Sequence, residues 1–424
     1  MLVICRTYLV IFLVMTSFIG CGGGSPVAIQ KMDDTYFLVS INMSSGISHE
    51  TMGEVYAQQI LQVLPEYEVI VDLSLKEEFD LLESRGLSFS TAIARATTLK
   101  ATLPQDYQDE IDGMLSVFSY DQDVLGDGHL SKNELLIYQL FPDVGRPTQC
   151  SASAAFGDSS ATGKTIFGRN FDWYQLPSNG MSKLHAVTII KNGSKSLVFI
   201  HFLGQLIPVS AFNSAGVFAA LLDVGTGAAY PSLEGKQSYP FGLRYALENY
   251  STLQDVSNYI KGQDYAYNHL VFLADQTTAG VVEENIGSSA RGLRTATSAL
   301  ISDYTWDIPD VFATVNTFML PGNYAPSPPL DKNVKRWNSF TTLYNTYLGQ
   351  GKIDIPTMKL IAGYPGTDGG AATSGAIYRS TDLSPTLQSI IMRMDTYEMW
   401  IAFSPLGSPP TTPTYIKVFS EKPF

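Results

Sequence analysis

The sequence predicts an α+β fold built of stacked layers. Helical spacing of apolar residues dominates the chain before Cys150, and apolar strand patterns dominate it afterwards. Strands and helices come in blocks, which favours packed layers over a regular winding of alternate strands and helices. With 424 residues, of which 45% are hydrophobic and 12% aromatic, the chain has enough apolar surface to bury a large core.

Residues 31–149 carry most of the helical signals. Apolar spacing predicts helices over residues 54–64, 77–82, 91–99, 107–118 and 135–140. The last of these follows Ser131-Lys132-Asn133-Glu134, which has the spacing of a capping box. We therefore expect this part of the chain to be helical.

Strand patterns begin at residue 165. They cover residues 165–173, 186–190, 196–202, 209–212, 217–222, 270–274, 280–284, 312–315, 387–394 and 397–403. Glycine-containing turns over 191–194 and 213–216 join two pairs of these strands, as is typical of β-hairpins. Further helices are predicted over residues 241–248, 253–260 and 332–347.

The first residues of the chain have the layout of a targeting signal. Arg6 precedes an apolar run over 8–19 that is too short to span a bilayer comfortably. Cys21 follows a glycine and precedes a Gly/Ser stretch, which resembles a bacterial lipoprotein cleavage box. That resemblance implies removal of residues 1–20, lipidation of Cys21 and a flexible tether over 21–30. The protein would be exported and held on a bacterial membrane, at the outer membrane or cell surface, by the lipid alone. The alternative is an ordinary secretory signal with an incidental cysteine.

The charge and the cysteines of the chain argue against certain binding partners and against a disulfide-stabilised fold. The chain has 27 basic and 40 acidic residues, so its net charge of −13 argues against nucleic acid or anionic lipid as a partner. Its three cysteines are Cys5, Cys21 and Cys150. The first lies in the predicted signal and the second is the lipidation site that the resemblance implies, so Cys150 would be left alone and no disulfide framework is expected.

Residues 123–134 have the spacing of a calcium loop. Asp123, Asp127 and Glu134 stand at ligand positions, although Leu125 occupies one that should carry oxygen. The same residues also fit a capping box without any metal. The sequence of this segment therefore fits both a calcium site and the start of a helix.

Cys150 needs a base if it is a nucleophile, because a thiol at its ordinary pKa is mostly protonated at neutral pH. No Gly-x-Ser-x-Gly elbow is present, and His185 and His201 lie within predicted strands, which favours structural roles for both. Cutting the Gln149–Cys150 peptide bond would free an α-amine at Cys150. Such an amine has an ordinary pKa of about 7.7–8.0, which suits a general base.

The motifs around Cys150 resemble those of the N-terminal nucleophile (Ntn) hydrolases. Cys150-Ser151 followed by Phe167-Gly168-Arg169-Asn170-Phe171-Asp172-Trp173 is similar to the choloylglycine hydrolase and penicillin acyltransferase group of linear amide hydrolases. Acid ceramidase and acylethanolamine amidase are related to this group. The resemblance implies that Cys150 is the nucleophile, that Arg169 lowers its pKa, and that Asp172 holds the new α-amine. Ser151 departs from the more usual threonine.

The resemblance extends downstream in the same order. Asn213, within 212–217, and Asn316, within 314–318, stand where the family has its oxyanion-hole asparagines. Arg336, within 333–337, stands where the family has an active-site arginine. These matches imply a four-layer αββα sandwich of two mainly antiparallel sheets. They divide the mature chain into a helical pro-segment over 31–149, the alpha chain, and a catalytic chain over 150–424, which stay associated after cleavage.

The implied activity is hydrolysis of a linear amide bond in a small N-acyl substrate, through an acyl-enzyme at Cys150 and with no metal or organic cofactor required. Transfer of the acyl group to an amine uses the same intermediate and stays open. The alternative from another class is a non-catalytic surface lipoprotein that binds calcium or a partner. The sequence does not determine the acyl group or the oligomeric state.

Overall fold

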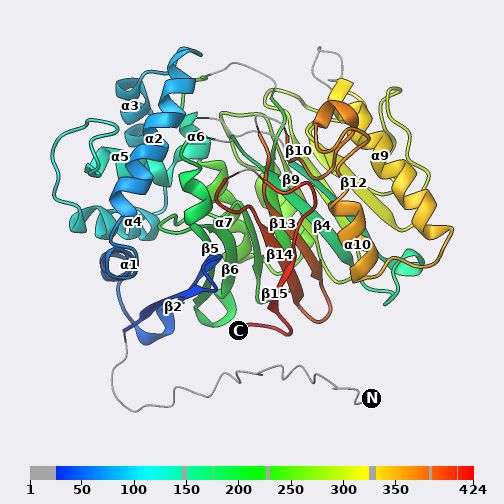
Figure 1. Cartoon of the computed structure of the whole chain (residues 1–424), viewed down its shortest axis with the longest axis horizontal. Helices are drawn as coiled ribbons and strands as arrows, with labels where there is room; N and C mark the ends of the chain where they lie inside the picture. Colours follow the sequence, from blue (N-terminus) through cyan, green and yellow to red (C-terminus); the bar gives the residue numbers. More distant parts are fainter. Residues whose placement is uncertain are drawn as a thin grey trace, which may run out of the picture.

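A computed structural model describes residues 25–145, 150–174, 176–225, 230–323, 331–381, 384–407 and 409–424. Two β-sheets are stacked at the centre of the molecule, with helices on both outer faces and a separate group of helices to one side (Figure 1). The predicted signal, Cys21 and the junction before Cys150 lie outside the described residues. None of the helices within these ranges is both long and apolar enough to span a bilayer.

The larger sheet has nine strands among the described residues, in the order β1-β2-β5-β6-β7-β8-β9-β10-β11. Its strands are β1 Val27–Met32, β2 Tyr36–Asn42, β5 His185–Lys191, β6 Leu197–Phe202, β7 Ser210–Asn213, β8 Phe218–Asp223, β9 His269–Ala274, β10 Ala279–Glu284 and β11 Gly292–Thr295. All neighbours pair antiparallel except β2 and β5, which are parallel.

The smaller sheet has six described strands in the order β12-β3-β4-β13-β14-β15, all antiparallel. They are β3 Cys150–Ala155, β4 Ile166–Asp172, β12 Val311–Val315, β13 Thr386–Arg393, β14 Glu398–Phe403 and β15 Ile416–Phe419. Aromatic rings join the two sheets. Phe167 of β4 packs against Phe218 of β8 with ring centroids 4.3 Å apart, and against Phe272 of β9 at 5.7 Å.

Two helices cover each outer face. On the nine-stranded sheet lie α7 Tyr239–Asn249 and α8 Leu253–Lys261, and on the six-stranded sheet lie α9 Asp331–Leu348 and α10 Ile355–Ala362. Gly168 of β4 allows α10 to approach closely, because a Cβ at this position would stand 2.9 Å from the Cβ of Ala362. The predicted four-layer αββα sandwich is therefore confirmed.

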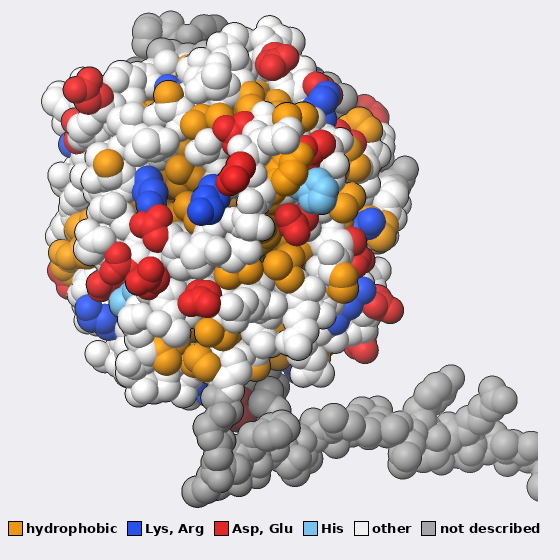
Figure 2. Space-filling model, turned by 90° about the vertical axis from the view of Figure 1, so that its left-hand side faces the viewer, with side chains coloured by type: hydrophobic (Ala, Val, Ile, Leu, Met, Phe, Trp, Pro, Cys, Tyr) orange, Lys and Arg blue, Asp and Glu red, His pale blue; other side chains and the backbone are white. Residues whose placement is uncertain are grey.

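The remaining helices precede Cys150 and form the group beside the sandwich (Figure 1). They are α1 His49–Val63, α2 Tyr67–Glu83, α3 Phe89–Lys100, α4 Gln105–Val117, α5 Lys132–Gln139 and α6 Phe141–Gly145, and short 3₁₀ turns are η1 Met43–Ser45, η2 Gly157–Ser159, η3 Gly180–Lys183, η4 Gly193–Lys195 and η5 Ala372–Ser374. Helices α1 and α4 touch at glycines, since a Cβ on Gly53 would lie 2.0 Å from the carbonyl oxygen of Glu110. Apolar side chains gather on the outer face of this group (Figure 2). Val69, Leu73 and Val124 are exposed apolar residues of the same segment of the chain.

The start of the described chain differs from its prediction. Residues 27–30, expected within the tether, belong to β1, and the pro-segment expected over 31–149 opens with the rest of a hairpin. This hairpin adds two strands to the nine-stranded sheet through the parallel pairing of β2 with β5. Val27, Val39 and Ile41 alternate into the core, but the polar residues between them conceal the strand pattern in the sequence. Only residues 21–24 of the expected tether lie outside the structure's description.

One buried ion pair joins the helical group to the sandwich. Arg244 of α7 donates to Glu110 of α4 with Nη2 2.8 Å from Oε1, and His49 Nδ1 lies 2.7 Å from the same carboxylate oxygen. Arg244 and Glu110 have side chains only 3% and 1% exposed. A cut before Cys150 would leave this contact intact between the two resulting chains.

We expect Glu110→Ala to destabilise the protein by about 3–5 kcal/mol, because it leaves Arg244 charged and buried without its main partner. Urea unfolding measures this loss. The double variant Glu110→Met/Arg244→Met should recover most of it, since two apolar side chains remove the unpaired charge. A single variant that costs less than the double variant would contradict the expectation.

Candidate active site

Three strand ends of the six-stranded sheet meet at one place. Strand β3 begins at Cys150, beside the ends of β4 at Asp172 and of β12 at Val315. In the register, Cys150 pairs with Phe171 and Ser151 pairs with Val315. Asn316 therefore follows β12 directly opposite Cys150. Antiparallel pairing thus gathers residues that are far apart in the sequence.

The thiol of Cys150 faces the space between the two sheets. Arg169 lies on the same face of β4, and its Nη2 donates both to Cys150 Sγ at 3.6 Å and to the carbonyl oxygen of Leu221 at 2.8 Å. The side chain of Cys150 is buried, and burial raises the pKa of its thiol above the ordinary value, although Arg169 acts in the opposite direction. The predicted lowering by Arg169 is therefore present but is outweighed by burial.

Asn316 contacts the main chain of Cys150 directly. Its Oδ1 accepts from the backbone N of Cys150 at 2.9 Å and from Arg336 Nη1 at 3.0 Å, while its Nδ2 donates to the carbonyl oxygen of Asp223 at 2.6 Å. Two donors on one side and a carbonyl acceptor on the other determine the orientation of the amide. Asn316 thus presents its oxygen to Cys150, and its NH₂ group, expected at the oxyanion, is bound to Asp223.

Asp172 lies on the opposite face of β4, within a buried cluster of cations. Arg336 Nη2 and Arg379 Nη1 lie 3.3 and 3.5 Å from its Oδ2, and Thr386 donates to Oδ1 at 2.7 Å. Burial raises the pKa of Asp172, whereas the two guanidinium groups lower it. Arg336 therefore joins Asp172 to Asn316 and links both residues to the backbone of Cys150.

Asn213 is not brought to this site. Asn213 is the last residue of β7 and lies at the turn that leads into the start of β8. The contacts near Cys150 come from the opposite end of β8, at residues 221–223. The Nδ2 of Asn213 donates to the carbonyl oxygens of Leu247 and Tyr250, and its Oδ1 accepts from the N of Val217. The asparagine joins the hairpin turn to the end of α7. Its assignment to the oxyanion hole is corrected on this geometry.

Several site residues were missed in the sequence. Asp223 supplies the carbonyl that Asn316 binds, and Asn333 Nδ2 donates to the carbonyl oxygen of Asn316 at 2.8 Å. Arg379 and Thr386 contact Asp172 from segments that precede and begin β13. One signal was available, because Asp223, like Asn316, is a polar residue directly after a predicted apolar strand. Arg379 and Thr386 have no comparable signal.

The predicted calcium ligands are not gathered around a metal position. No group of three or more Asp, Glu, His or Cys residues suited to a metal ion occurs in the described part of the chain. Glu134 closes a capping box with Ser131, and Asp123 accepts from Ser131 Oγ at 2.7 Å. Asp127 accepts from the hydroxyl of Tyr120 at 2.8 Å. The structure therefore supports the helix-start interpretation of residues 123–134.

The two strand histidines are structural, as expected. His185 Nε2 lies 3.1 Å from the carbonyl oxygen of Ser404, and His201 Nε2 lies 2.7 Å from Thr188 Oγ1. Burial lowers the pKa of His185 to about 4 and that of His201 to about 3. Both are neutral at physiological pH, and their hydrogen-bond partners among the described residues do not include Cys150.

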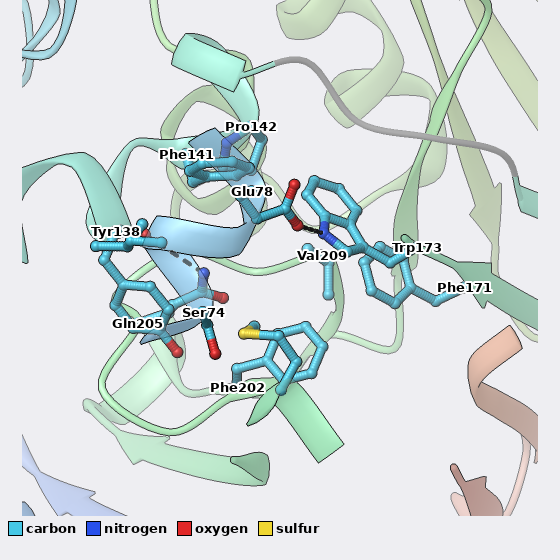
Figure 3. A pocket seen from close by; sticks show the side chains of 12 residues that line it. Ser74, Glu78, Tyr138, Phe141, Pro142, Phe171, Trp173, Phe202, Gln205 and Val209 are labelled. Atoms are coloured by element: carbon cyan, nitrogen blue, oxygen red, sulfur yellow. Dashed lines mark hydrogen bonds between the residues drawn. The ribbon is translucent and has the colours of Figure 1, made fainter. Parts of the chain in front are cut away.

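An apolar pocket lies between the end of β4 and the helices that precede Cys150. Phe171, directly across from Cys150 in the register, lines it together with Trp173 from the same strand face, and Phe202 completes this wall (Figure 3). The opposite wall comes from helices before Cys150. The cavity volume of the pocket is about 30 Å³. It is therefore a narrow slot.

A single carboxyl group stands in this slot. Glu78 of α2 accepts from Trp173 Nε1 with Oε1 at 2.6 Å, as Figure 3 shows. Its Oε2 is buried and has no hydrogen-bond partner among the described residues. Burial raises the pKa of Glu78 to about 8, against smaller opposing effects of Trp173 and Arg85. The carboxyl is therefore mostly protonated at neutral pH.

This raised pKa makes stability depend on pH with a definite sign. The folded protein holds a proton on Glu78 that the unfolded chain releases near its ordinary value, so the stability of the fold falls as pH rises towards 8. Between pH 4.5 and 7 we expect wild type to lose about 3 kcal/mol relative to Glu78→Gln, which keeps an acceptor for Trp173 but does not titrate. Urea unfolding at the two pH values measures the difference. Glu77→Gln on the same helix is the control, and equal pH slopes in wild type and Glu78→Gln would refute the assignment.

Comparison with known proteins finds likeness in solved structures alone. No family model and no curated protein sequence matches the chain. An N-acylethanolamine-hydrolyzing acid amidase ortholog from Caenorhabditis elegans matches with TM-score 0.40 and 14% identity, over 57% of this chain and 92% of that one. A conjugated bile acid hydrolase from Clostridium perfringens matches with TM-score 0.39 and 12% identity, over 64% and 93%. A penicillin V acylase from Agrobacterium tumefaciens matches with TM-score 0.37 and 11% identity, over 63% and 86%. The similarity concerns the path of the backbone only, and no residue of this chain is assigned a role from it.

Proposed function

We propose that this protein is a self-processing cysteine amide hydrolase whose nucleophile is Cys150. The observation that carries the proposal is the pairing of a buried thiol with a held main-chain nitrogen in the same residue. Arg169 donates to Sγ, and Asn316 accepts from N. A cut before Cys150 would turn that nitrogen into an amine that is already positioned beside its own thiol.

Processing begins in the uncut chain. Cys150 Sγ attacks the carbonyl carbon of residue 149, the C–S bond forms, and the C–N bond to Cys150 breaks. The nitrogen takes up the thiol proton and becomes an α-amine. Water then hydrolyses the thioester, releasing a carboxylate on the upstream chain and the free thiol on Cys150. The helical segment stays bound through contacts such as that between Glu110 and Arg244.

The new α-amine supplies the missing base. Burial raises the pKa of the Cys150 thiol, so the thiol does not ionise readily without help. An α-amine has an ordinary pKa of about 7.7–8.0 and can accept the thiol proton at neutral pH. Asn316 Oδ1, already 2.9 Å from this nitrogen, would orient the amine. Asp172 holds Arg336, which in turn donates to Asn316.

The substrate carbonyl also needs hydrogen-bond donors as it becomes tetrahedral. Arg169 has two such donors beside the thiol, since its Nε and Nη1 are buried without hydrogen-bond partners among the described residues. Its Nη2 is anchored to Leu221, which limits the movement of the guanidinium. We assign to Arg169 the stabilisation of both the thiolate and the oxyanion. The acyl group then remains on Sγ, the amine product leaves, and water completes the hydrolysis.

Cys150→Ala should abolish both processing and activity, because it removes the atom that attacks each carbonyl. Denaturing electrophoresis with N-terminal sequencing should find a chain that begins at Cys150 in wild type and one uncut chain in the variant. A panel of chromogenic acyl amides measures activity. Ser151→Ala, the next residue of the strand, is the matched control and should still be cut. An active wild-type protein that remains uncut would overturn the free-amine mechanism, and a wild type without activity would favour a non-catalytic lipoprotein.

Asn316→Ala and Asn213→Ala separate the two asparagines that the sequence motifs placed together. Removing the acceptor for the Cys150 nitrogen should lower kcat/KM by about 10²–10⁴, the range for loss of general acid–base assistance. Asn213→Ala should lower thermal stability while kcat/KM stays within about threefold of wild type, because its side chain binds only backbone groups away from the thiol. Steady-state kinetics on processed protein and thermal unfolding are the measurements. A large kinetic loss in Asn213→Ala would restore that residue to the site.

A further inference from the structure

The apolar slot beside Cys150 is placed to receive the acyl group of the substrate. Cys150 and Phe171 are directly opposite on neighbouring antiparallel strands, so their side chains share one face with Cβ atoms roughly 4.5–5.5 Å apart. Trp173 stands two residues further along the extended chain, about 7 Å beyond Phe171. The slot therefore runs from Phe171, the strand neighbour of Cys150, towards Trp173 and Glu78.

Glu78 is the one carboxylic acid among the side chains that line this slot, which also include the polar Ser74, Tyr138 and Gln205. Its surroundings are the rings of Phe141, Phe171 and Trp173, with Leu75 and Val209 among the other lining side chains (Figure 3). One carboxyl oxygen is satisfied by Trp173, and the other is buried with no partner among the described residues. An unsatisfied polar group in an apolar cavity costs stability, and a ligand that supplies the missing hydrogen bond recovers that cost.

Resting on the proposed function, we propose that Glu78 is a specificity-determining residue that selects acyl groups carrying an oxygen atom within an otherwise apolar chain. The free carboxyl oxygen of Glu78 donates a hydrogen bond to this ether, keto or hydroxyl oxygen, while Trp173 holds the other carboxyl oxygen in place. The pKa of Glu78, raised to about 8 by burial, keeps the donated proton in place at neutral pH.

The geometry narrows the substrate class further. Because the carboxyl lies beyond Phe171, the selected oxygen is in the middle of the acyl chain and not next to the scissile carbonyl. The slot is narrow, which favours an unbranched acyl chain over a branched one. Glu78 also belongs to α2, before Cys150 in the sequence, so the released helical chain remains part of the substrate site after cleavage.

The test is an oxygen scan along the acyl chain. Substrates are the 4-nitroanilide of octanoic acid and analogues in which each methylene in turn is replaced by an ether oxygen. For wild type, we expect one mid-chain position to stand out from its neighbours by at least about tenfold in kcat/KM, because an unpaired buried donor costs on this order. Glu78→Leu should lose that preference, with the ratio of the best oxygen analogue to octanoyl falling at least tenfold.

Three further variants separate hydrogen bonding from packing. Glu78→Gln keeps a donor of the same shape and should retain most of the preference. Glu77→Gln removes a neighbouring carboxylate that binds Ser178 outside the slot, and should leave the preference unchanged. Glu78→Met replaces Glu78→Leu if the latter does not fold. The same oxygen preference in wild type and Glu78→Leu or Glu78→Met, or no preference in wild type, overturns the proposal.

A binding experiment distinguishes failure of this inference from failure of the proposed activity. Methyl ketones with the same eight-atom acyl chains have no amide bond to cleave, and calorimetry measures their binding to wild type and to each variant. Discrimination that depends on Glu78 without any anilide hydrolysis would support the role of Glu78 and refute the amidase. Hydrolysis combined with equal binding of all ketones would support the amidase and refute the role of Glu78.

Discussion

The hydrogen bond between the backbone N of Cys150 and Oδ1 of Asn316 is the contact on which the site depends. It joins the start of β3 to the end of β12, and the same oxygen accepts from Arg336 of α9. Through Arg336 the contact reaches Asp172, and through Nδ2 of Asn316 it reaches the facing sheet at Asp223. Four elements, β12, α9, β4 and β8, are therefore positioned around one nitrogen atom of β3. No other rotation of the Asn316 amide satisfies all of these hydrogen bonds.

Burial is the second constraint, and it affects three acidic groups in the same direction. It raises the pKa values of Cys150, Asp172 and Glu78, because each would carry its charge away from water. The consequences differ with the neighbours. Asp172 has two guanidinium groups within 3.5 Å and Cys150 has one at 3.6 Å, whereas the second carboxyl oxygen of Glu78 has no hydrogen-bond partner among the described residues. A thiol that needs a base and a carboxyl that can donate a proton result from the same physical cause.

Much of the fold was predictable because its signals are local. The alternating strands from β4 to β10 and the closing hairpin of β13 and β14 lie within a few residues of their predicted limits. The first hairpin, β1 and β2, was missed because exposed Gln30 and Lys31 interrupt its apolar pattern. Helix α10 was missed because it is short and begins at Ile355-Pro356, where proline suits a first turn but also suits a loop.

The sequence by itself determined that Cys150 is a lone thiol followed by an Arg-x-x-Asp pattern on the next strand. It also determined the layered α+β class and the helical character of much of the chain before Cys150. Each of these features depends on residues that are close together in the sequence. Tertiary structure alone decided which asparagine meets Cys150, because Asn213 and Asn316 both follow apolar strands, and only the pairing of β12 with β3 brings one of them to the thiol. It also decided that Glu78 faces Phe171 and Trp173, 93 and 95 residues later in the chain. Side chains at such separations meet only when sheets and helices pack, so no local pattern encodes their contact.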